Sequence, residues 1–191
     1  SLIPHWKERL ENNWGSWICT MTRETYGQVA QGVAVENLGG MSNAMAIRHV
    51  AAHASYDDED LLVEVARKAM FTHRAEEALG GGEFFARVTH RVIQGAHPRK
   101  AISEVADLMD GLFQDKALQG IAKADEVLNG ESPLAKELFC DDLALTSMAR
   151  LWDVGRSEPI KVGKASPTEG TLPGSVYLIL KYVDEDEGLK K

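Results

Sequence analysis

The stretch Gly39-Gly40-Met41-Ser42-Asn43-Ala44-Met45-Ala46-Ile47-Arg48 joins a glycine loop to the start of a helix. Two adjacent glycines give a loop access to positive φ and let a ligand come close to the backbone. Ser42 or Asn43 can then cap the helix that begins at Ala44. The free N–H groups and the positive dipole end of such a helix favour an anion such as phosphate. An ordinary capped helix has the same pattern, so the stretch predicts either a plain helix cap or an anion site.

Composition and charge indicate a globular protein of one domain. The chain has 191 residues, of which 44% are apolar and 26% are charged, the usual balance for a folded protein. A chain of this length buries about 70% of its unfolded surface. The net charge is −8, and the short turn His97-Pro98-Arg99-Lys100 is not a phosphate-tracking stripe. We therefore expect no nucleic-acid partner.

Cysteine use and hydropathy indicate a cytoplasmic setting. Cys19 and Cys140 belong to no CxxC pattern, and two distant cysteines form no disulfide framework, so we expect a reducing compartment. No apolar run approaches the roughly 20 residues that cross a bilayer, and we expect no membrane partner. Composition and charge leave a homo-oligomer open.

Apolar residues recur at helical spacing along the chain, and no stretch alternates as a strand does. The sequence therefore predicts an all-α fold. We expect helices over residues 4–13, 22–33, 61–70, 101–108, 118–128, 133–151 and 173–182, and a further helix from 44 through at least 52. Residues 75–94 are periodic as well, and the loop between the last two helices covers 156–169. This loop is long enough to be functional.

Four local patterns leave alternatives open. The acids of Asp57-Asp58-Glu59-Asp60 fit the start of a helix better than a metal site, since the helix dipole favours them there. Thr72 predicts a helix cap with His73 in the first turn, where a lone histidine is more often structural than catalytic. Gly80-Gly81-Gly82 either breaks a helix or lets another helix pack closely. Asp141 and Asp142 are adjacent, point to different faces and predict a solvated surface.

No complete catalytic constellation occurs in the sequence. The chain has no HExxH, no nucleophile elbow and no P-loop. Trp6, Trp14 and Trp17 fit a core or a groove lining, and a helical module that binds a protein partner through these tryptophans is one interpretation. On residue chemistry alone, the chain is a helical domain with one candidate anion-binding turn.

Three segments, in this order, resemble the ADP-ribosylglycohydrolase and J1-crystallin superfamily. The first is Gly40-Met41-Ser42-Asn43-Ala44-Met45-Ala46-Ile47-Arg48, and the second is Thr72-His73 at the head of a long helix. The third is Gly170-Thr171-Leu172-Pro173-Gly174-Ser175-Val176-Tyr177-Leu178-Ile179-Leu180-Lys181-Tyr182, similar to the family's penultimate helix. The resemblance implies an orthogonal multi-helix bundle. It also implies that Gly80-Gly81-Gly82 is a close-packing stretch inside a continuous helix.

The resemblance further implies a ligand site. In the family, ADP-ribose lies in a cleft beside two Mg²⁺ ions, and the Ser/Asn loop contacts its phosphates. Carried over by position, this nominates Gly40, Ser42, Asn43 and His73 as ADP-ribose-binding residues. N–H and hydroxyl donors suit a phosphate, and an imidazole suits a ribose hydroxyl. The implied reaction is Mg²⁺-assisted hydrolysis of an ADP-ribosyl linkage to a protein side chain or nucleotide.

The chain departs from the family pattern at its metal ligands. The family's Thr-Asp-Asp and Gly-Gly-Asp segments are both absent, and Ala51 stands where a proline often follows the family's arginine. We therefore expect residues 1–191 to be one helical domain that lacks the metal-binding segments, holds no Mg²⁺ and is inactive alone. We nominate no catalytic or metal-ligating residue. The non-enzymatic alternative is a structural protein like the J1 crystallins.

Overall fold

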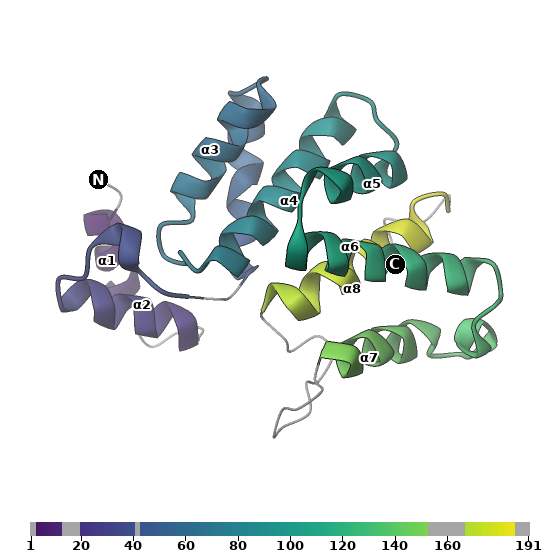
Figure 1. The fold of residues 1–191 in the computed structure, drawn as a ribbon. Helices are drawn as coiled ribbons and strands as arrows, with labels where there is room; N and C mark the ends of the chain where they lie inside the picture. Colours follow the sequence, from purple (N-terminus) through teal and green to yellow (C-terminus); the bar gives the residue numbers. More distant parts are fainter. Residues whose placement is uncertain (1–2, 13–19, 41–42, 153–166, 186–191) are drawn as a thin grey trace.

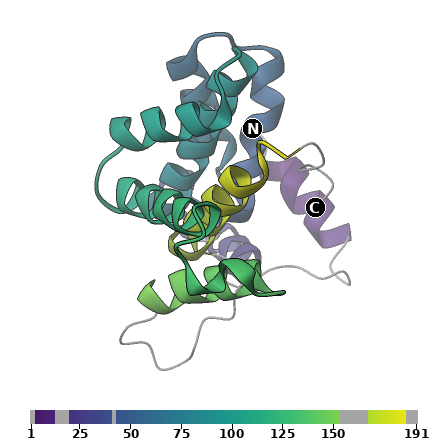
Figure 2. The same cartoon turned by 90° about the vertical axis from the view of Figure 1, so that its right-hand side faces the viewer.

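The computed structural model describes residues 3–12, 20–40, 43–152 and 167–185, which form an all-α bundle without a β-strand (Figure 1). The helices run in several directions rather than along one axis (Figure 2). Their bounds are α1 (Ile3–Asn12), α2 (Thr20–Ala30), η1 (Val35–Asn37), η2 (Asn43–Ala54), α3 (Glu59–Ala69), α4 (Glu76–Ile93), α5 (Pro98–Leu108), α6 (Gly111–Leu128), η3 (Pro133–Lys136), α7 (Cys140–Trp152) and α8 (Thr168–Tyr182), where η marks a 3₁₀ helix. The all-α prediction is confirmed.

The main core lies where α4, α5, α6, α7 and α8 meet. Phe84, Ile102, Leu172, Val176 and Tyr177 are fully buried in it. Each large apolar side chain of this kind contributes about 1.5–3 kcal/mol when it leaves water. A smaller core between η2, α3 and α4 contains Ala52, Leu62, Val63, Ala66 and Ala86. The long helix α4 therefore contributes to both cores.

The three glycines of α4 lie inside a continuous helix, as the resemblance implies. A Cβ on Gly80 would stand 2.1 Å from the Phe113 ring, and one on Gly81 would stand 2.8 Å from Thr168 Oγ1. Thr168 Oγ1 also donates a hydrogen bond to the Glu77 carbonyl at 2.6 Å. Glycine in a helix costs about 1 kcal/mol, and here that cost is offset by the close approach of α6 and α8.

Helices α6 and α8 also pack closely against each other, at Gly120 of α6. A Cβ on Gly120 would stand 2.6 Å from the Pro173 carbonyl oxygen and 2.8 Å from Val176 Cβ. The sequence predicted a last helix over 173–182, beginning at Pro173. This was wrong, because α8 begins at Thr168 and Pro173 lies inside it.

Three other predicted helices differ from the structure. The helix predicted over 118–128 begins earlier, because α6 starts at Gly111. The predicted helix over 133–151 is interrupted: Ser132 Oγ accepts from Leu134 N–H and starts only the short η3, after which α7 begins at Cys140. The helix predicted from Ala44 is present as η2, but it is 3₁₀ rather than α. Runs of 3₁₀ helix longer than about four residues are uncommon, so η2 is an unusual element.

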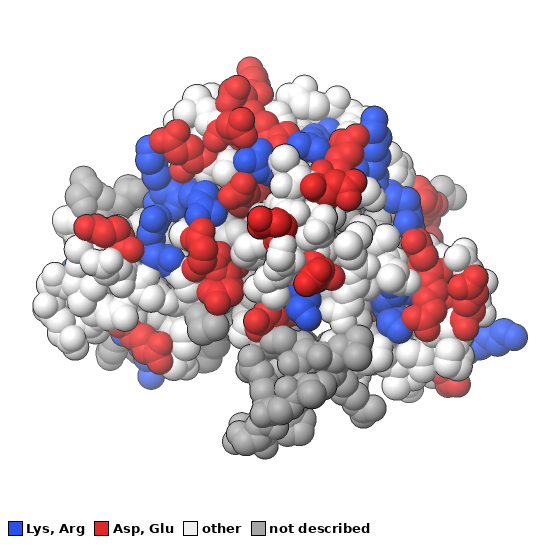
Figure 3. Space-filling view, viewed as in Figure 1, with Lys and Arg blue, Asp and Glu red and all other residues white. Residues whose placement is uncertain are grey.

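Charged side chains are interspersed by sign on the face shown in Figure 3. Red groups border the blue ones across this face. Among the described residues, no helix is both long enough and apolar enough to span a membrane.

Candidate functional site

The glycine loop before η2 is held in place by α2. Gly39 N–H donates to Gln28 Oε1 at 3.0 Å. Thr25, on the same helix and 1% exposed, has its Oγ1 2.7 Å from the Thr72 carbonyl and 3.3 Å from the Gly39 carbonyl. Because the Thr25 hydroxyl has one hydrogen to donate, the shorter contact, to the Thr72 carbonyl, is the stronger of these two hydrogen bonds. Two polar side chains of one helix thus fix the loop and the turn at Thr72 beside each other.

Gly40 and His73 are in direct contact. Gly40 has φ of +124°, a conformation that L side chains rarely adopt, and a Cβ there would stand 3.0 Å from His73 Cδ2 and 3.2 Å from its Cα. Glycine is therefore required twice at this position, for its backbone conformation and for the space that the imidazole occupies. The fold brings together two nominated residues that are 33 positions apart in the sequence.

His73 is completely buried, with one ring nitrogen engaged. Its Nδ1 lies 3.0 Å from Thr72 Oγ1, while its Nε2 has no hydrogen-bond partner among the described residues. If the threonine hydroxyl donates to Nδ1, Nε2 carries the proton and can donate to a ligand; the tautomer follows from this bond. A buried polar atom without a partner costs free energy, so Nε2 marks a place where a ligand atom would be favourable.

Burial keeps this imidazole neutral. Burial, followed by the positive charge of Arg48, lowers the pKa of His73 to about 4. Arg48 is itself partly buried, donates to the Ala69 carbonyl at 3.1 Å and lies 5.2 Å from the centre of the Phe71 ring. Burial also lowers the pKa of Arg48. The site thus combines a neutral imidazole with a nearby cation, a combination suited to an anionic ligand.

The structure places two of the four nominated residues. Gly40 and His73 lie together, whereas Ser42 and the side chain of Asn43, the first residue of η2, lie outside the described residues. Trp14, Trp17 and the side chain of Trp6 lie outside them too. The predicted cap at Thr72 was wrong, because α4 begins at Glu76 and His73 lies in the turn before it.

Sequence reasoning missed the supports of this site. Thr25 and Gln28 lie in an amphipathic helix whose pattern does not distinguish them from surface polar residues. Their role depends on contacts across 47 and 11 residues of chain, which no local pattern encodes. Arg48, by contrast, lies within the quoted motif, and its partial burial is the signal that sequence alone lacks.

The acids before α3 act as a cap and in ion pairs. Asp58 Oδ1 accepts from Leu61 N–H at 2.8 Å, as expected for a helix N-cap. Glu59 pairs with Arg87 at 2.8 Å and with Arg91 at 3.0 Å. Burial alone would raise the pKa of Glu59, but hydrogen bonds from the two arginines lower it below its ordinary value. The capping interpretation is confirmed.

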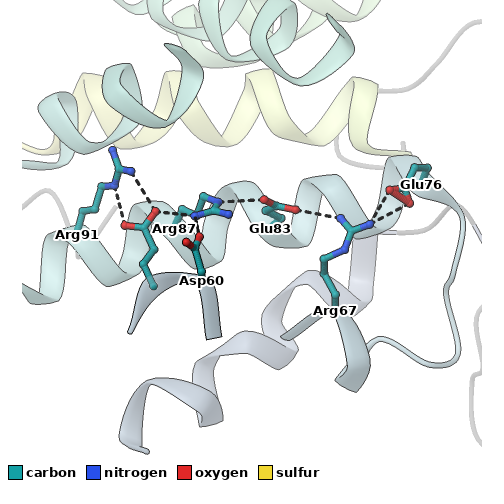
Figure 4. A network of polar contacts seen from close by, with 7 residues as sticks. Asp60, Arg67, Glu76, Glu83, Arg87 and Arg91 are labelled. Atoms are coloured by element: carbon teal, nitrogen blue, oxygen red, sulfur yellow. Dashed lines mark hydrogen bonds and ion pairs between the residues drawn. The ribbon is translucent and has the colours of Figure 1, made fainter. Parts of the chain in front are cut away.

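These pairs belong to a ladder of ions between α3 and α4, shown in Figure 4. Arg67 bridges two glutamates, at 2.6 Å to Glu76 and 3.0 Å to Glu83, and Arg87 continues the row from Glu83 to Glu59. The arginines of the ladder are 13–30% exposed in their side chains, so solvent screens them less than free surface pairs. The ladder fixes α3 on α4, and its carboxylates are committed to arginines.

Asp141 differs from the predicted solvated residue. It accepts from Tyr177 at 2.6 Å, from Lys181 at 2.5 Å and from Tyr182. Burial would raise the pKa of Asp141, but hydrogen bonds from Lys181 and the tyrosines lower it. Asp142 is exposed as predicted. The acid pair thus anchors α7 to α8 through its first member.

The described residues do not fit the two Mg²⁺ ions that the resemblance implies. No group of three or more His, Cys, Asp or Glu side chains among them is arranged to hold a metal ion. Mg²⁺ requires several oxygen ligands in near-octahedral geometry, and the ladder carboxylates are already engaged.

The fold and the site define an all-α bundle in which a glycine loop meets a buried, neutral histidine. The family model described as ADP-ribosylglycohydrolase matches residues 2–189. The chain therefore belongs to the ADP-ribosylglycohydrolase family. No curated protein and no solved structure matches it significantly.

Proposed function

We propose that this chain binds an ADP-ribosyl group, with the phosphates at the loop Gly40-Met41-Ser42-Asn43 and a hydroxyl or phosphate oxygen at His73 Nε2. The observation that carries the proposal is the contact between Gly40 and the His73 ring, with Nε2 buried and without a partner among the described residues. Family membership supplies the chemical class of the ligand.

Each group has a defined part in the proposed site. Backbone N–H groups and the Ser42 hydroxyl would donate to phosphate oxygens, which accept strongly because they are charged. His73, with its pKa lowered to about 4, stays neutral at pH 7 and offers one N–H donor. Arg48 supplies a positive charge near the loop. This role does not require Arg48 to form an ion pair with a carboxylate.

We further propose that the chain has no hydrolase activity on its own. The reaction implied by the family resemblance uses Mg²⁺ to activate water for cleavage of the ADP-ribosyl linkage. The described residues offer no group to hold such an ion, whereas the proposed phosphate contacts need none. Ligand binding independent of metal, without turnover, is therefore the expected behaviour.

The test is calorimetric titration of ADP-ribose into the full chain, with and without Mg²⁺. We expect binding in both conditions, competition by ADP, and weaker competition by adenosine, which lacks phosphate. Ser42→Ala should weaken binding about tenfold to a hundredfold, the loss expected for one hydrogen bond to a charged group. Ser103→Ala, in α5, is the matched control and should leave the affinity unchanged.

Three results would overturn this proposal in different ways. Release of ADP-ribose from a modified protein by this polypeptide would contradict the expected inactivity. Binding that requires Mg²⁺ would show that residues of this chain complete a metal site. Absence of binding would favour the J1-crystallin-like structural role or a protein-binding module instead.

A further inference from the structure

Three histidines meet between η2 and α4, and the proposed ADP-ribose site uses none of them. His49 and His53 come from η2 and His90 from α4. His49 is 6% exposed and His90 is 8% exposed, whereas His53 is partly open to solvent. Histidine is uncommon in helix interfaces that serve packing alone, since its ring brings two polar nitrogens that need partners.

The ring nitrogens of the η2 pair are aimed at each other. His49 Nδ1 lies 3.0 Å from His53 Nε2, and the two rings stand at 90° with centres 5.1 Å apart. Two imidazole nitrogens bound to one zinc ion at about 2.0–2.1 Å lie roughly 3.0–3.4 Å apart. The observed separation lies at the short end of this range, and both rings would have to turn so that the two nitrogens face one ion instead of each other.

The protonation state of the pair also suits a metal. Metal ligation needs the neutral imidazole. Burial, followed by the neighbouring His53, lowers the pKa of His49 to about 4, and burial with His90 lowers the pKa of His53. In the hydrogen-bonded pair, one of the two facing nitrogens carries the shared hydrogen, so ion binding requires that ring to adopt its other tautomer, with the hydrogen on its second nitrogen.

The third histidine supports the pair from α4. The His90 ring stacks on His53 at 23° with 6.4 Å between ring centres. Because the two ring planes are close to parallel, the nitrogens of His90 do not point at an ion bound by His53. This agrees with the absence, among the described residues, of a ready group of three metal ligands. Water molecules would then complete the coordination on the open side of His53.

We propose that His49 and His53 form a two-imidazole site for a late first-row divalent cation, Zn²⁺ or Cu²⁺, at the η2–α4 interface. Imidazole nitrogen favours these ions, and Mg²⁺ favours oxygen ligands. The site therefore differs in its ligand chemistry from the Mg²⁺ ions that the resemblance implies. It ties together two turns of η2, the unusual 3₁₀ element that follows the glycine loop.

The experiment uses the full chain after treatment with a chelator. Zn²⁺ is titrated calorimetrically in the presence of excess Mg²⁺, and Cu²⁺ is examined by electron paramagnetic resonance. We expect Zn²⁺ binding of about one ion per chain, weakened tenfold or more in His53→Gln, since even loss of an outer-shell partner costs 10–100-fold. His97→Gln is the matched control, because His97 is half exposed, pairs with Asp184 and lies outside the cluster; it should bind as the parent does.

The Cu²⁺ spectrum keeps the test valid if the variant fails to fold. In the unaltered chain, we expect nitrogen hyperfine splitting from at least two imidazoles. A spectrum with fewer nitrogens, equal Zn²⁺ affinity in His53→Gln and the parent, or displacement of Zn²⁺ by excess Mg²⁺ would each overturn the proposal. In that event the 3.0 Å contact is a hydrogen bond only. None of these results depends on whether ADP-ribose binds.

Discussion

The α6–α8 interface and the η2–α4 interface hold the same bundle together by different chemistry. In the first, Gly120 lies against the Pro173 carbonyl and Val176, so that the two backbones come as close as they can. In the second, a smaller apolar core is accompanied by the imidazoles of His49, His53 and His90. The first interface depends on the absence of a side chain at Gly120. The second depends on the protonation state of the imidazoles of His49 and His53.

The difference teaches where each interface is vulnerable. A contact built on glycine responds to added volume, because a dense core cannot absorb another carbon cheaply. A contact built on neutral histidines responds to pH, because a buried imidazole must not become charged. Gly120→Val and acidification each perturb one of these interfaces, whereas Gly40→Ala and Arg87→Gln perturb contacts outside both.

The largest effect is expected from Gly120→Val. The first added carbon would meet a backbone oxygen at 2.6 Å and Val176 at 2.8 Å, neither of which is a flexible side-chain end. We expect a loss of about 3 kcal/mol or more in the free energy of unfolding, the upper range for overpacking. Chemical denaturation measures it. Gly27→Val, in α2 with nothing within 4 Å of its Cβ position, is the control, and a loss there as large would discredit the packing argument.

Acidification should act on the histidine interface. The pKa of His49 is about 4 in the folded chain and about 6.5 when unfolded. Between these values the unfolded state binds the proton more readily, so stability falls as pH drops from about 6.5 to 4, and above 6.5 this group adds no pH dependence. The expected loss is about 2–3 kcal/mol at pH 4.5.

The measurement for this prediction is denaturation as a function of pH, with hydrogen exchange to locate the loss. His49→Gln should flatten the slope below pH 6.5. Amides of η2 should lose protection before those of α6 and α8. Simultaneous loss in all three helices would contradict the contrast between the interfaces. His73, with a pKa of about 4, has the same sign and would remain in the variant.

Gly40→Ala tests a glycine whose role is conformational as well as spatial. A φ of +124° is unfavourable for alanine, and its Cβ would meet His73 at 3.0 Å. We expect a loss of about 1–2 kcal/mol in stability together with weaker ADP-ribose binding. Thermal denaturation and calorimetry measure the two effects. Unchanged binding would remove the loop from the proposed site even if stability fell.

The smallest effect is expected from Arg87→Gln in the ion ladder. It removes pairs to Glu59, Asp60 and Glu83, of which Asp60 is largely exposed. The expected loss is about 1 kcal/mol, reduced at high salt, because screening weakens partly exposed pairs. Denaturation at low and high salt measures it. Lys68→Gln, which removes one exposed pair within α3, should have almost no effect.

The sequence predicted most of the fold because helical periodicity is a local signal. The positions of α1, α3, α4 and α5 follow from it within a few residues. Gly80-Gly81-Gly82 needed the family resemblance, since propensity alone favours a break and only the contacts with Phe113 and Thr168 explain the continuous helix. The early start of α8 was missed because a helix running through Pro173 goes against local preference.

The site was predictable to a smaller extent. Gly40 and His73 were named by motif, and the fold places them in contact. Thr25 and Gln28 could not be named, because their hydrogen bonds join segments whose proximity is set by tertiary packing. The histidine cluster was missed for a related reason: His49 and His53 have a visible spacing of four, but their burial and His90 come only with the fold.

The glycines of α4 and α6 also set limits on how this chain can vary. Every missense change at a glycine codon adds at least one carbon, so Gly80, Gly81 and Gly120 have no mild substitution available, whatever nucleotide changes. An open position such as Gly27 tolerates several. In a library of random mutants selected only for soluble protein, these three codons should remain nearly unchanged. The close packing of the bundle would then be visible as positions at which no substitution is recovered.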